Sequence, residues 1–184
     1  AGHASPGFDD GVPDGLLLVV EVVALELAQA AAAHTKLSHT NGKGGRKNMA
    51  KVGFIGLGSM GRRMAANLAG DGIELLAFDI DAGARRAAQG PAVGVAENVE
   101  SVGRDCKLVF LSLPDGDVVE DVLFAQGGLA ASLTAGAVVV DTSTCHLEVT
   151  RSFATRLASQ DVSFLDAPVS GMEHRAEDGT LTVM

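Results

Sequence analysis

Three glycines with a fixed spacing occur in Gly56–Gly61, which reads Gly-Leu-Gly-Ser-Met-Gly. The segment follows a short apolar run and precedes an amphipathic one, so it predicts a turn from a strand into a helix. In such a turn the first glycine permits the bend, the second lets the backbone approach a pyrophosphate, and the third allows close packing. A helix beginning near Ser59 would direct free N–H groups and its positive dipole end at the phosphates. The candidate phosphate-binding residues are Gly56, Leu57, Gly58, Ser59, Met60 and Gly61.

A carboxylate, Asp79, ends the next predicted strand, eighteen residues after Gly61. At this position of a dinucleotide-binding fold, a carboxylate accepts hydrogen bonds from the adenosine ribose and repels the extra phosphate of NADP. We therefore expect NAD as the cofactor. Arg85 and Arg86 follow on the next predicted helix, where we expect solvated surface charges, although they leave NADP possible.

Two further predicted strands end in Leu113-Pro114 and in Thr142-Ser143-Thr144. Ligands of open α/β sheets bind outside the carboxyl ends of the strands, so we expect both segments along the same cleft. Pro114 stops its strand, because proline has no N–H to donate to a neighbouring strand. The three hydroxyls could anchor the nicotinamide amide or cap the helix that follows, and these roles are compatible.

The elements that must position these residues alternate between strand and helix from Met49 onward. Apolar runs such as LVFLSL and AVVVD lack polar alternation, as do strands of a parallel sheet that is covered on both faces. Repeated strand–helix units of this kind predict an α/β fold with a doubly wound, mainly parallel sheet in residues 49–184. We expect strands at Lys51–Gly56, Glu74–Asp79, Ala92–Val95, Lys107–Leu113, Ala137–Asp141, Ser163–Ala167 and Leu181–Met184, and helices at Ser59–Ala69, Ala82–Gln89, Ala96–Gly103, Asp117–Phe124 and Leu147–Ser159.

Residues 1–48 lack the strand–helix alternation of the rest of the chain. They predict an extension or linker with one helix, at Leu16–Ala33. Glu21 and Glu26 lie inside that apolar stretch, and acidic groups are unfavourable in lipid, so we expect no membrane segment. The chain starts with an alanine and ends inside an apolar run, which suggests a piece of a longer protein.

Composition limits the partners and the chemistry. The net charge of −9 argues against nucleic-acid binding, which requires clustered lysine and arginine. The two cysteines, Cys106 and Cys145, and the scattered histidines have no metal-site spacing, so we expect no metal. Two free thiols favour a reducing compartment, the cytoplasm, with an organelle left open.

Four motifs in order, GFIGLGSMGRRMAANL, LSLPD, DTST and LDAPVSG…GTLTVM, resemble the β-hydroxyacid dehydrogenases. That family includes 3-hydroxyisobutyrate dehydrogenase, tartronate semialdehyde reductase and, more distantly, 6-phosphogluconate dehydrogenase. The resemblance spans Lys51 to Met184 and implies the NAD(P)-binding Rossmann domain of an enzyme. Such an enzyme oxidises a small 3-hydroxy acid to its semialdehyde, or catalyses the reverse reduction, and we expect a homo-oligomer at full length.

The resemblance also implies roles for single residues. Leu113 and Pro114 should contact the cofactor, and Thr144 should lie near the nicotinamide. Ser170 and Gly171 match the segment that anchors the substrate carboxylate. Cys145 occupies a variable position and is not expected to act as a nucleophile.

Two substitutions depart from the family pattern S-G-G-x-x-G-A. Met172 replaces a glycine whose backbone should approach the substrate, so its side chain is expected to crowd the pocket. Arg175 replaces a second glycine, as in sugar-acid dehydrogenases, and could pair with a substrate carboxylate or remain a solvated loop residue.

The resemblance places the catalytic lysine, and an asparagine one helical turn later, in a helical domain downstream of Met184. Without that lysine, which acts as the general acid/base, the chain should bind cofactor but not turn over. Two alternatives stay open: a non-catalytic dinucleotide-binding module, and the sugar-acid or 6-phosphogluconate branch of the same family.

Overall fold

The structure, a computed structural model, describes residues 51–184. The predicted helix at Leu16–Ala33 and the boundary between residues 48 and 49 lie outside the described residues. Within the described range, none of the helices combines the length and apolar character needed to cross a bilayer.

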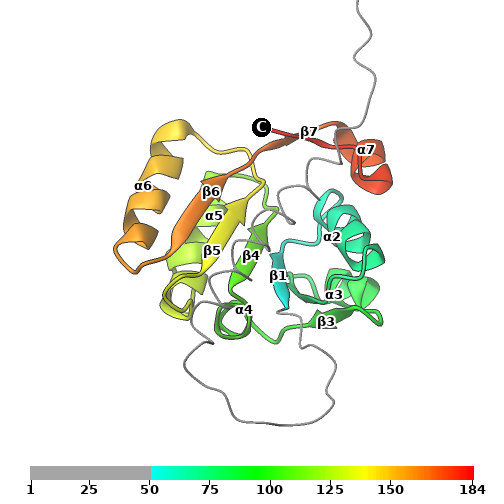
Figure 1. The fold of residues 1–184 in the computed structure, drawn as a ribbon, viewed down its shortest axis with the longest axis horizontal. Helices are drawn as coiled ribbons and strands as arrows, with labels where there is room; N and C mark the ends of the chain where they lie inside the picture. The colour runs from blue at the N-terminus through cyan, green and yellow to red at the C-terminus, as the bar shows by residue number, and fades with distance from the viewer. Residues whose placement is uncertain (1–50) are drawn as a thin grey trace, which may run out of the picture.

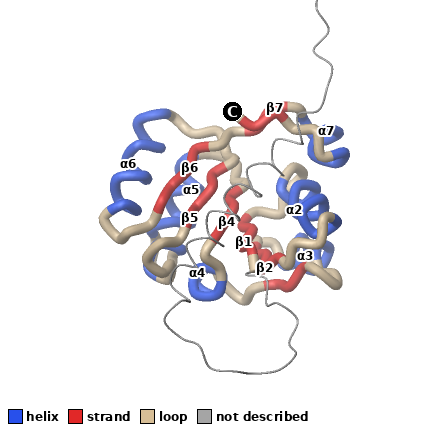
Figure 2. The backbone as a smooth tube through the Cα atoms, in the orientation of Figure 1, coloured by secondary structure: helices blue, strands red, loops and turns tan. Residues whose placement is uncertain are grey.

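A six-stranded parallel sheet forms the centre of the fold, with the strand order β3-β2-β1-β4-β5-β6 (Figures 1 and 2). The order reverses between β1 and β4, so the predicted doubly wound, Rossmann-type sheet is confirmed. The strands are β1 (Val52–Ile55), β2 (Leu75–Phe78), β3 (Val93–Val95), β4 (Leu108–Leu111), β5 (Val138–Asp141) and β6 (Ser163–Asp166).

Helices cover both faces of this sheet, which lies between them in Figure 1. One face packs against α2 (Gly61–Gly70) and α3 (Ala82–Ala88). The other packs against α4 (Val99–Asp105), α5 (Gly116–Phe124), the 3₁₀ turn η1 (Leu129–Ala131) and α6 (Leu147–Ala158).

Successive strand residues alternate between the two cores. Phe54 belongs to the α2 side, where its ring stacks on Phe110 at 6.2 Å between centroids, and Ile55 belongs to the α5 side. All residues of β1 and β4 are buried, which explains their continuous apolar sequence.

Main-chain hydrogen bonds fix the loops that leave the carboxyl ends of these strands. The N–H of Gly56 donates to the carbonyl of Phe78, and the N–H of Ser112 donates to the carbonyl of Ile55, each at 2.9 Å. The glycine segment and the Ser112–Pro114 segment therefore start at adjacent, well-defined points.

Several predicted boundaries are wrong for local reasons. The first helix begins at Gly61 rather than near Ser59, with Met60 as its N-cap. The helix expected from Ala96 begins at Val99, because the Asn98 side chain accepts the N–H of Ser101 at 2.8 Å and caps it there.

The C-terminal part differs most from the prediction. Thr182–Val183 forms β8, which pairs antiparallel with β7 (Val169–Ser170) in a separate two-stranded sheet instead of joining the parallel sheet. Between them lies an unpredicted helix, α7 (Met172–Asp178), which lies beside α2 (Figure 1) and is capped at its C-terminus by Gly179, with φ of 80°.

Candidate functional site

A cavity of about 930 Å³ opens at the carboxyl ends of β1, β2, β4 and β5. This is the place where the strand order reverses, as expected for a ligand site in a doubly wound sheet. Among the predicted cofactor residues it brings together Gly56, Gly58, Ser59, Met60, Gly61, Asp79, Leu113, Pro114 and Thr144. Leu57 is the exception.

The three glycines of the turn have different surroundings. Gly56 has φ of 97°, and a Cβ there would overlap the carbonyl of Ser112. A Cβ on Gly61 would overlap the carbonyl oxygen of Gly56. A Cβ on Gly58 would meet no atom within 4 Å, and Gly58 is exposed. Gly56 and Gly61 are therefore required by the fold, whereas Gly58 leaves open space at the cavity.

The N-terminus of α2 faces this space with unused donors. Met60 makes no side-chain capping hydrogen bond, and the first turn of the helix contains no acidic residue. Helix N-termini attract anions through their free N–H groups and the positive end of the helix dipole. The turn therefore fits a pyrophosphate.

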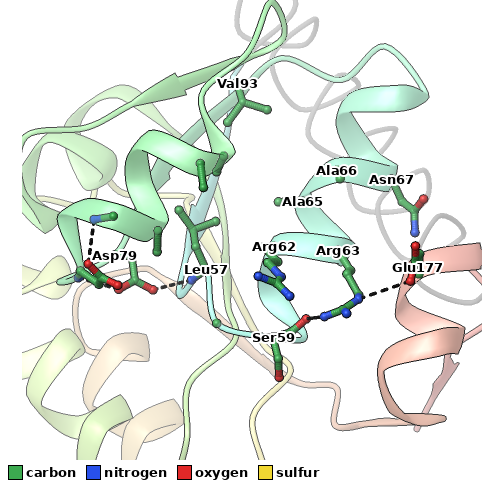
Figure 3. A pocket seen from close by; sticks show the side chains of 16 residues that line it. Leu57, Ser59, Arg62, Arg63, Ala65, Ala66, Asn67, Asp79, Val93 and Glu177 are labelled. Carbon is green, nitrogen blue, oxygen red and sulfur yellow. Dashed lines mark hydrogen bonds and ion pairs between the residues drawn. The ribbon is translucent and has the colours of Figure 1, made fainter.

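Asp79 is held in place by the backbone. Its Oδ2 accepts the N–H of Leu57 at 2.6 Å, as Figure 3 shows, and its Oδ1 accepts the N–H of Asp81 at 2.8 Å. Each carboxylate oxygen has a second lone pair, so the ribose hydroxyls of a cofactor can still be accepted. Leu57 thus contributes through its N–H rather than by lining the cavity.

Arg85 is not the solvated charge that the sequence suggested. Its guanidinium donates to the carbonyls of Asp79 and Ile80 and lies over the ring of Phe78, with Cζ 5.5 Å from the centroid. Arg86 is exposed. Arg85 therefore stabilises the strand end that carries Asp79.

A second cavity, of about 880 Å³, lies on the other side of the glycine turn, between α2 and α3 (Figure 3). Leu57 and Arg62 line it, and Gly58, Ser59 and Asp79 line both cavities. The glycine turn therefore borders both cavities.

The hydroxyls of Thr142 and Ser143 are used inside the protein. Thr142 Oγ1 donates to the carbonyl of Leu111 at 2.7 Å, and Ser143 Oγ accepts the N–H of Leu113 at 2.9 Å. Neither caps the following helix, whose N-cap is His146. Thr144 is exposed and lines the larger cavity, so its hydroxyl is the one presented to a ligand.

Cys145 lies next to this hydroxyl but is a protonated thiol. Its Sγ donates to Asp141 Oδ2 at 3.5 Å, and burial together with the negative charge of Asp141 raises the pKa of Cys145 to about 12. A thiol is a nucleophile only as the thiolate, so the arrangement does not favour covalent catalysis. Residues 51–184 contain no cluster of three or more potential metal ligands.

The predicted substrate residues form a separate group. Ser170 lies on β7, Gly171 has φ of 137°, and Arg175 lies on α7 rather than in a loop. The Arg175 side chain covers Gly171, because a Cβ on Gly171 would come within 2.6 Å of Arg175 Cδ. None of the three lines the 930 Å³ cavity, although the adjacent Val169 does.

Met172 has φ of 60° and is 77% exposed. A non-glycine side chain is uncommon in this left-handed conformation. Met172 thus occupies a backbone conformation that favours glycine, and its exposed side chain does not line the 930 Å³ cavity.

The sequence did not point to the far wall of the larger cavity. Residues 125–128 after α5 line it, with φ of 76° at Gly127, and so does Ile80, which is 93% exposed. The available signals were the two consecutive glycines after a helix and an apolar residue between two aspartates.

Residues 51–184 match the family model described as the NAD binding domain of 6-phosphogluconate dehydrogenase. The chain belongs to this family. Its described part is therefore an NAD-binding domain, and the resemblance to β-hydroxyacid dehydrogenases is confirmed.

Relatives of this NAD-binding family include 2-(hydroxymethyl)glutarate dehydrogenase of Eubacterium barkeri, 39% identical over 134 residues that cover 73% of this chain and 44% of the relative. The solved structure of Mycobacterium tuberculosis 3-hydroxyisobutyrate dehydrogenase with L-serine is 30% identical, with a TM-score of 0.68, over 73% of this chain and 45% of that one. Psf3 in complex with NADP+ and 2-OPP is 26% identical, with a TM-score of 0.69, over 72% and 47%. The chain spans less than half the length of these relatives.

Proposed function

We propose that residues 51–184 are the NAD-binding and substrate-anchoring part of a 3-hydroxyacid dehydrogenase. The observation that carries the proposal is the single cavity that joins the glycine turn, Asp79, Leu113-Pro114 and Thr144 at the sheet's switch point. The similarity to 2-(hydroxymethyl)glutarate dehydrogenase and 3-hydroxyisobutyrate dehydrogenase supports the same reaction class.

Different residues of the cavity bind different parts of the dinucleotide in this proposal. The turn around Gly58 and the N-terminus of α2 hold the pyrophosphate, and Asp79 accepts the ribose hydroxyls. Thr144 would hold the nicotinamide amide through its hydroxyl, and Leu113 and Pro114 would contact the cofactor from the same cavity wall. NAD+ held there would supply the hydride acceptor for oxidation of the substrate's hydroxyl-bearing carbon.

The substrate carboxylate is assigned to the segment around Ser170 and Gly171, with Arg175 beside it. Both Ser170 and Arg175 are exposed. Their side chains are therefore accessible to a ligand or to a further part of the protein. We propose that the general acid/base is a lysine beyond Met184, so that the chain of 184 residues binds cofactor without catalysing turnover.

Asp79 supports NAD over NADP as the preferred cofactor, because its carboxylate repels a 2′-phosphate. Arg85 is not available to pair with a 2′-phosphate, since its guanidinium donates to the backbone carbonyls of Asp79 and Ile80. A homo-oligomer, a cytoplasmic location and a domain boundary at residue 49 are further proposals.

Fluorescence titration of the chain with NADH and NADPH tests the cofactor assignment. We expect saturable NADH binding and weaker NADPH binding. A chain that binds neither dinucleotide would refute the proposed function. Supplying the sequence beyond Met184 should then add hydroxy-acid-dependent reduction of NAD+, and a long form that binds NADH but oxidises no hydroxy acid would identify a non-catalytic module.

A further inference from the structure

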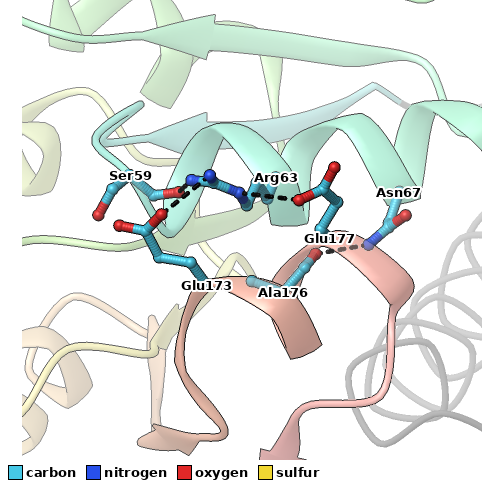
Figure 4. A network of polar contacts seen from close by, with 6 residues as sticks. All are labelled: Ser59, Arg63, Asn67, Glu173, Ala176 and Glu177. Atoms are coloured by element: carbon cyan, nitrogen blue, oxygen red, sulfur yellow. Dashed lines mark hydrogen bonds and ion pairs between the residues drawn. The ribbon is translucent and has the colours of Figure 1, made fainter.

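Two adjacent arginines at the start of α2 have different surroundings. Arg62 is exposed and lines the cavity between α2 and α3. The side chain of Arg63 is only 21% exposed and is directed toward α7, as Figure 4 shows. Arg63 is therefore a partly buried charge at the junction of two elements that lie far apart in the sequence.

Arg63 contacts three groups at once. Its Nη1 donates to the carbonyl of Ser59 at 2.5 Å, and its Nη2 lies 2.9 Å from Glu173 Oε2. Its Nε lies 3.6 Å from Glu177 Oε2. Glu173 and Glu177 are one helical turn apart and share a face of α7. One guanidinium thus links the glycine turn to the helix that follows Ser170-Gly171.

The docking of α7 on α2 also has contacts that do not involve Arg63. Asn67, one turn after Arg63, donates from Nδ2 to the carbonyl of Ala176 at 2.7 Å (Figure 4). Ala176 is completely buried in the core that contains Met64 and Leu68. These contacts hold the two helices together without Arg63, and what Arg63 adds is a direct link between the Ser59 carbonyl and the carboxylates of α7.

The Ser59 carbonyl matters because of the peptide to which it belongs. In a planar trans peptide the carbonyl and the following N–H point in opposite directions. When Arg63 holds the Ser59 carbonyl, the N–H of Met60 points away from Arg63. Met60 lines the 930 Å³ cavity, and no residue within 51–184 accepts its N–H. The donor is left for the cofactor.

We propose that Arg63 is a positioning residue that couples the pyrophosphate site to the substrate segment. It orients the Met60 N–H toward the cofactor and, through Glu173 and Glu177, fixes the helix that follows Ser170-Gly171. The inference rests on the proposed function of the cavity. Coupling of this kind is reciprocal, so cofactor binding also restrains α7.

The test compares the 184-residue chain with Arg63→Gln, Arg63→Lys and a matched control, Glu120→Gln. The control removes an exposed ion pair of the same type, Arg156–Glu120 at 2.7 Å, between α6 and α5 and outside the cavity. NADH affinity is measured by fluorescence, and hydrogen exchange of residues 172–178 is measured with and without NADH.

We expect Arg63→Gln to weaken NADH binding about tenfold, the effect of losing a charge-assisted hydrogen bond. Arg63→Lys should recover part of this loss, because it keeps the charge and one donor. NADH should slow hydrogen exchange in α7 of the original chain and of Glu120→Gln, but not of Arg63→Gln. A residue that only stabilises the fold would leave the NADH-dependent slowing intact.

The outcomes separate the two proposals. If the original chain does not bind NADH, the proposed function and this coupling both fail. If it binds NADH, and Arg63→Gln matches it in affinity and in α7 protection, the coupling alone is refuted. Should Arg63→Gln not fold, the double variant Glu173→Gln/Glu177→Gln removes the same ion pairs from exposed positions. That variant is expected to lose the NADH-dependent protection of α7, and retained protection would refute the coupling.

Discussion

The two sides of the cleft are built in different ways. The cofactor side consists of turns that directly follow buried parallel strands, with backbone hydrogen bonds at their first residues. The proposed substrate side, residues 169–184, consists of two strands of two residues each and a helix of seven. The cofactor side thus continues directly from the buried strands of the core. The proposed substrate side packs on the outside of the domain, with α7 against α2.

This difference has a consequence for stability. A two-stranded ribbon is marginally stable by itself, so β7 and β8 depend on the packing of Val169 and Val183 against the core and on the contacts of α7 with α2. Segments with few buried contacts open more readily than the core around them. The substrate side of the cleft is therefore expected to be the more mobile side, while the cofactor side unfolds only with the whole domain.

The largest expected loss of stability comes from Gly61→Ala, which disturbs the packing of the cofactor side. The added Cβ would overlap the Gly56 carbonyl oxygen, a backbone atom that cannot move aside alone. We expect the free energy of unfolding to fall by about 2–3 kcal/mol, as for overpacked core positions. Urea unfolding followed by circular dichroism measures this loss.

Gly58→Ala is the matched control within the same turn. Its Cβ would meet no atom within 4 Å, so stability should change by less than about 0.5 kcal/mol. NADH affinity should nevertheless fall, because the methyl group would occupy the space that we propose for the pyrophosphate. Equal stability losses in the two variants would contradict the distinction between them.

Asp79→Ala is the next largest change and affects binding more than folding. We expect NADH binding to weaken by about 1–3 kcal/mol, the cost of losing charge-assisted hydrogen bonds to the ribose. The variant also removes the acceptor of the Leu57 N–H, so a smaller loss of stability should accompany it. Calorimetric titration with NADH and NADPH measures both affinities.

Asp79→Asn separates these two effects. It keeps one oxygen that can accept the Leu57 N–H, replaces the acceptor of the Asp81 N–H by an NH2 group, and removes the charge that repels a 2′-phosphate. It should lose less stability than Asp79→Ala, because one of the two backbone hydrogen bonds is kept, while the preference for NADH over NADPH narrows. An unchanged preference would show that Asp79 does not select the cofactor.

The sequence was sufficient for the cofactor side because the signals there are local. Uninterrupted apolar runs predicted buried parallel strands, and strand ends in such sheets share one edge, so the cleft around Gly58, Asp79 and Pro114 followed. What remained undecided was which hydroxyl faces the ligand. Thr142 and Ser143 turned out to bond to neighbouring segments, and only tertiary contacts determine that.

The substrate side could not be predicted for the opposite reason. The sequence of α7, MEHRAED, is polar and has one buried residue, Ala176, so it shows no amphipathic period. Its position depends on Asn67 and Arg63, more than a hundred residues away in the chain, and no local pattern contains that information. The short pairing of β7 with β8 is equally a product of this docking.

Met172→Gly should stabilise residues 169–184, the less stable of the two sides. Met172 has φ of 60°, where a side chain is strained and glycine is not. We expect the free energy of unfolding to rise by about 0.5–1 kcal/mol, since relief of the strain exceeds the entropy that glycine adds to the unfolded chain. Met172→Ala keeps a Cβ and should bring no gain. Differential scanning calorimetry measures both, and equal melting temperatures for the two variants would contradict the strain.

The smallest expected effect concerns Cys145, in the loop that follows β5. Its carboxylate neighbour Asp141 ends β5 beside Asp166 of β6, and burial, followed by the charge of Asp141, raises the pKa of Asp166 as well. Because the pKa of Cys145 is raised to about 12, its thiol stays protonated throughout the neutral range, and labelling by a disulfide reagent should be slow at pH 7.

The labelling rate should then increase with each unit of pH up to 10 instead of levelling off near 8.5, the value of an unperturbed thiol. Asp141→Asn removes the negative charge and should speed the labelling of Cys145 at a given pH, whereas the distant Cys106 is unaffected. Labelling that levels off near pH 8.5 in the original chain would contradict the influence of Asp141.

Cys145→Ser should leave NADH binding unchanged, because the thiol faces Asp141 and takes no part in holding the cofactor.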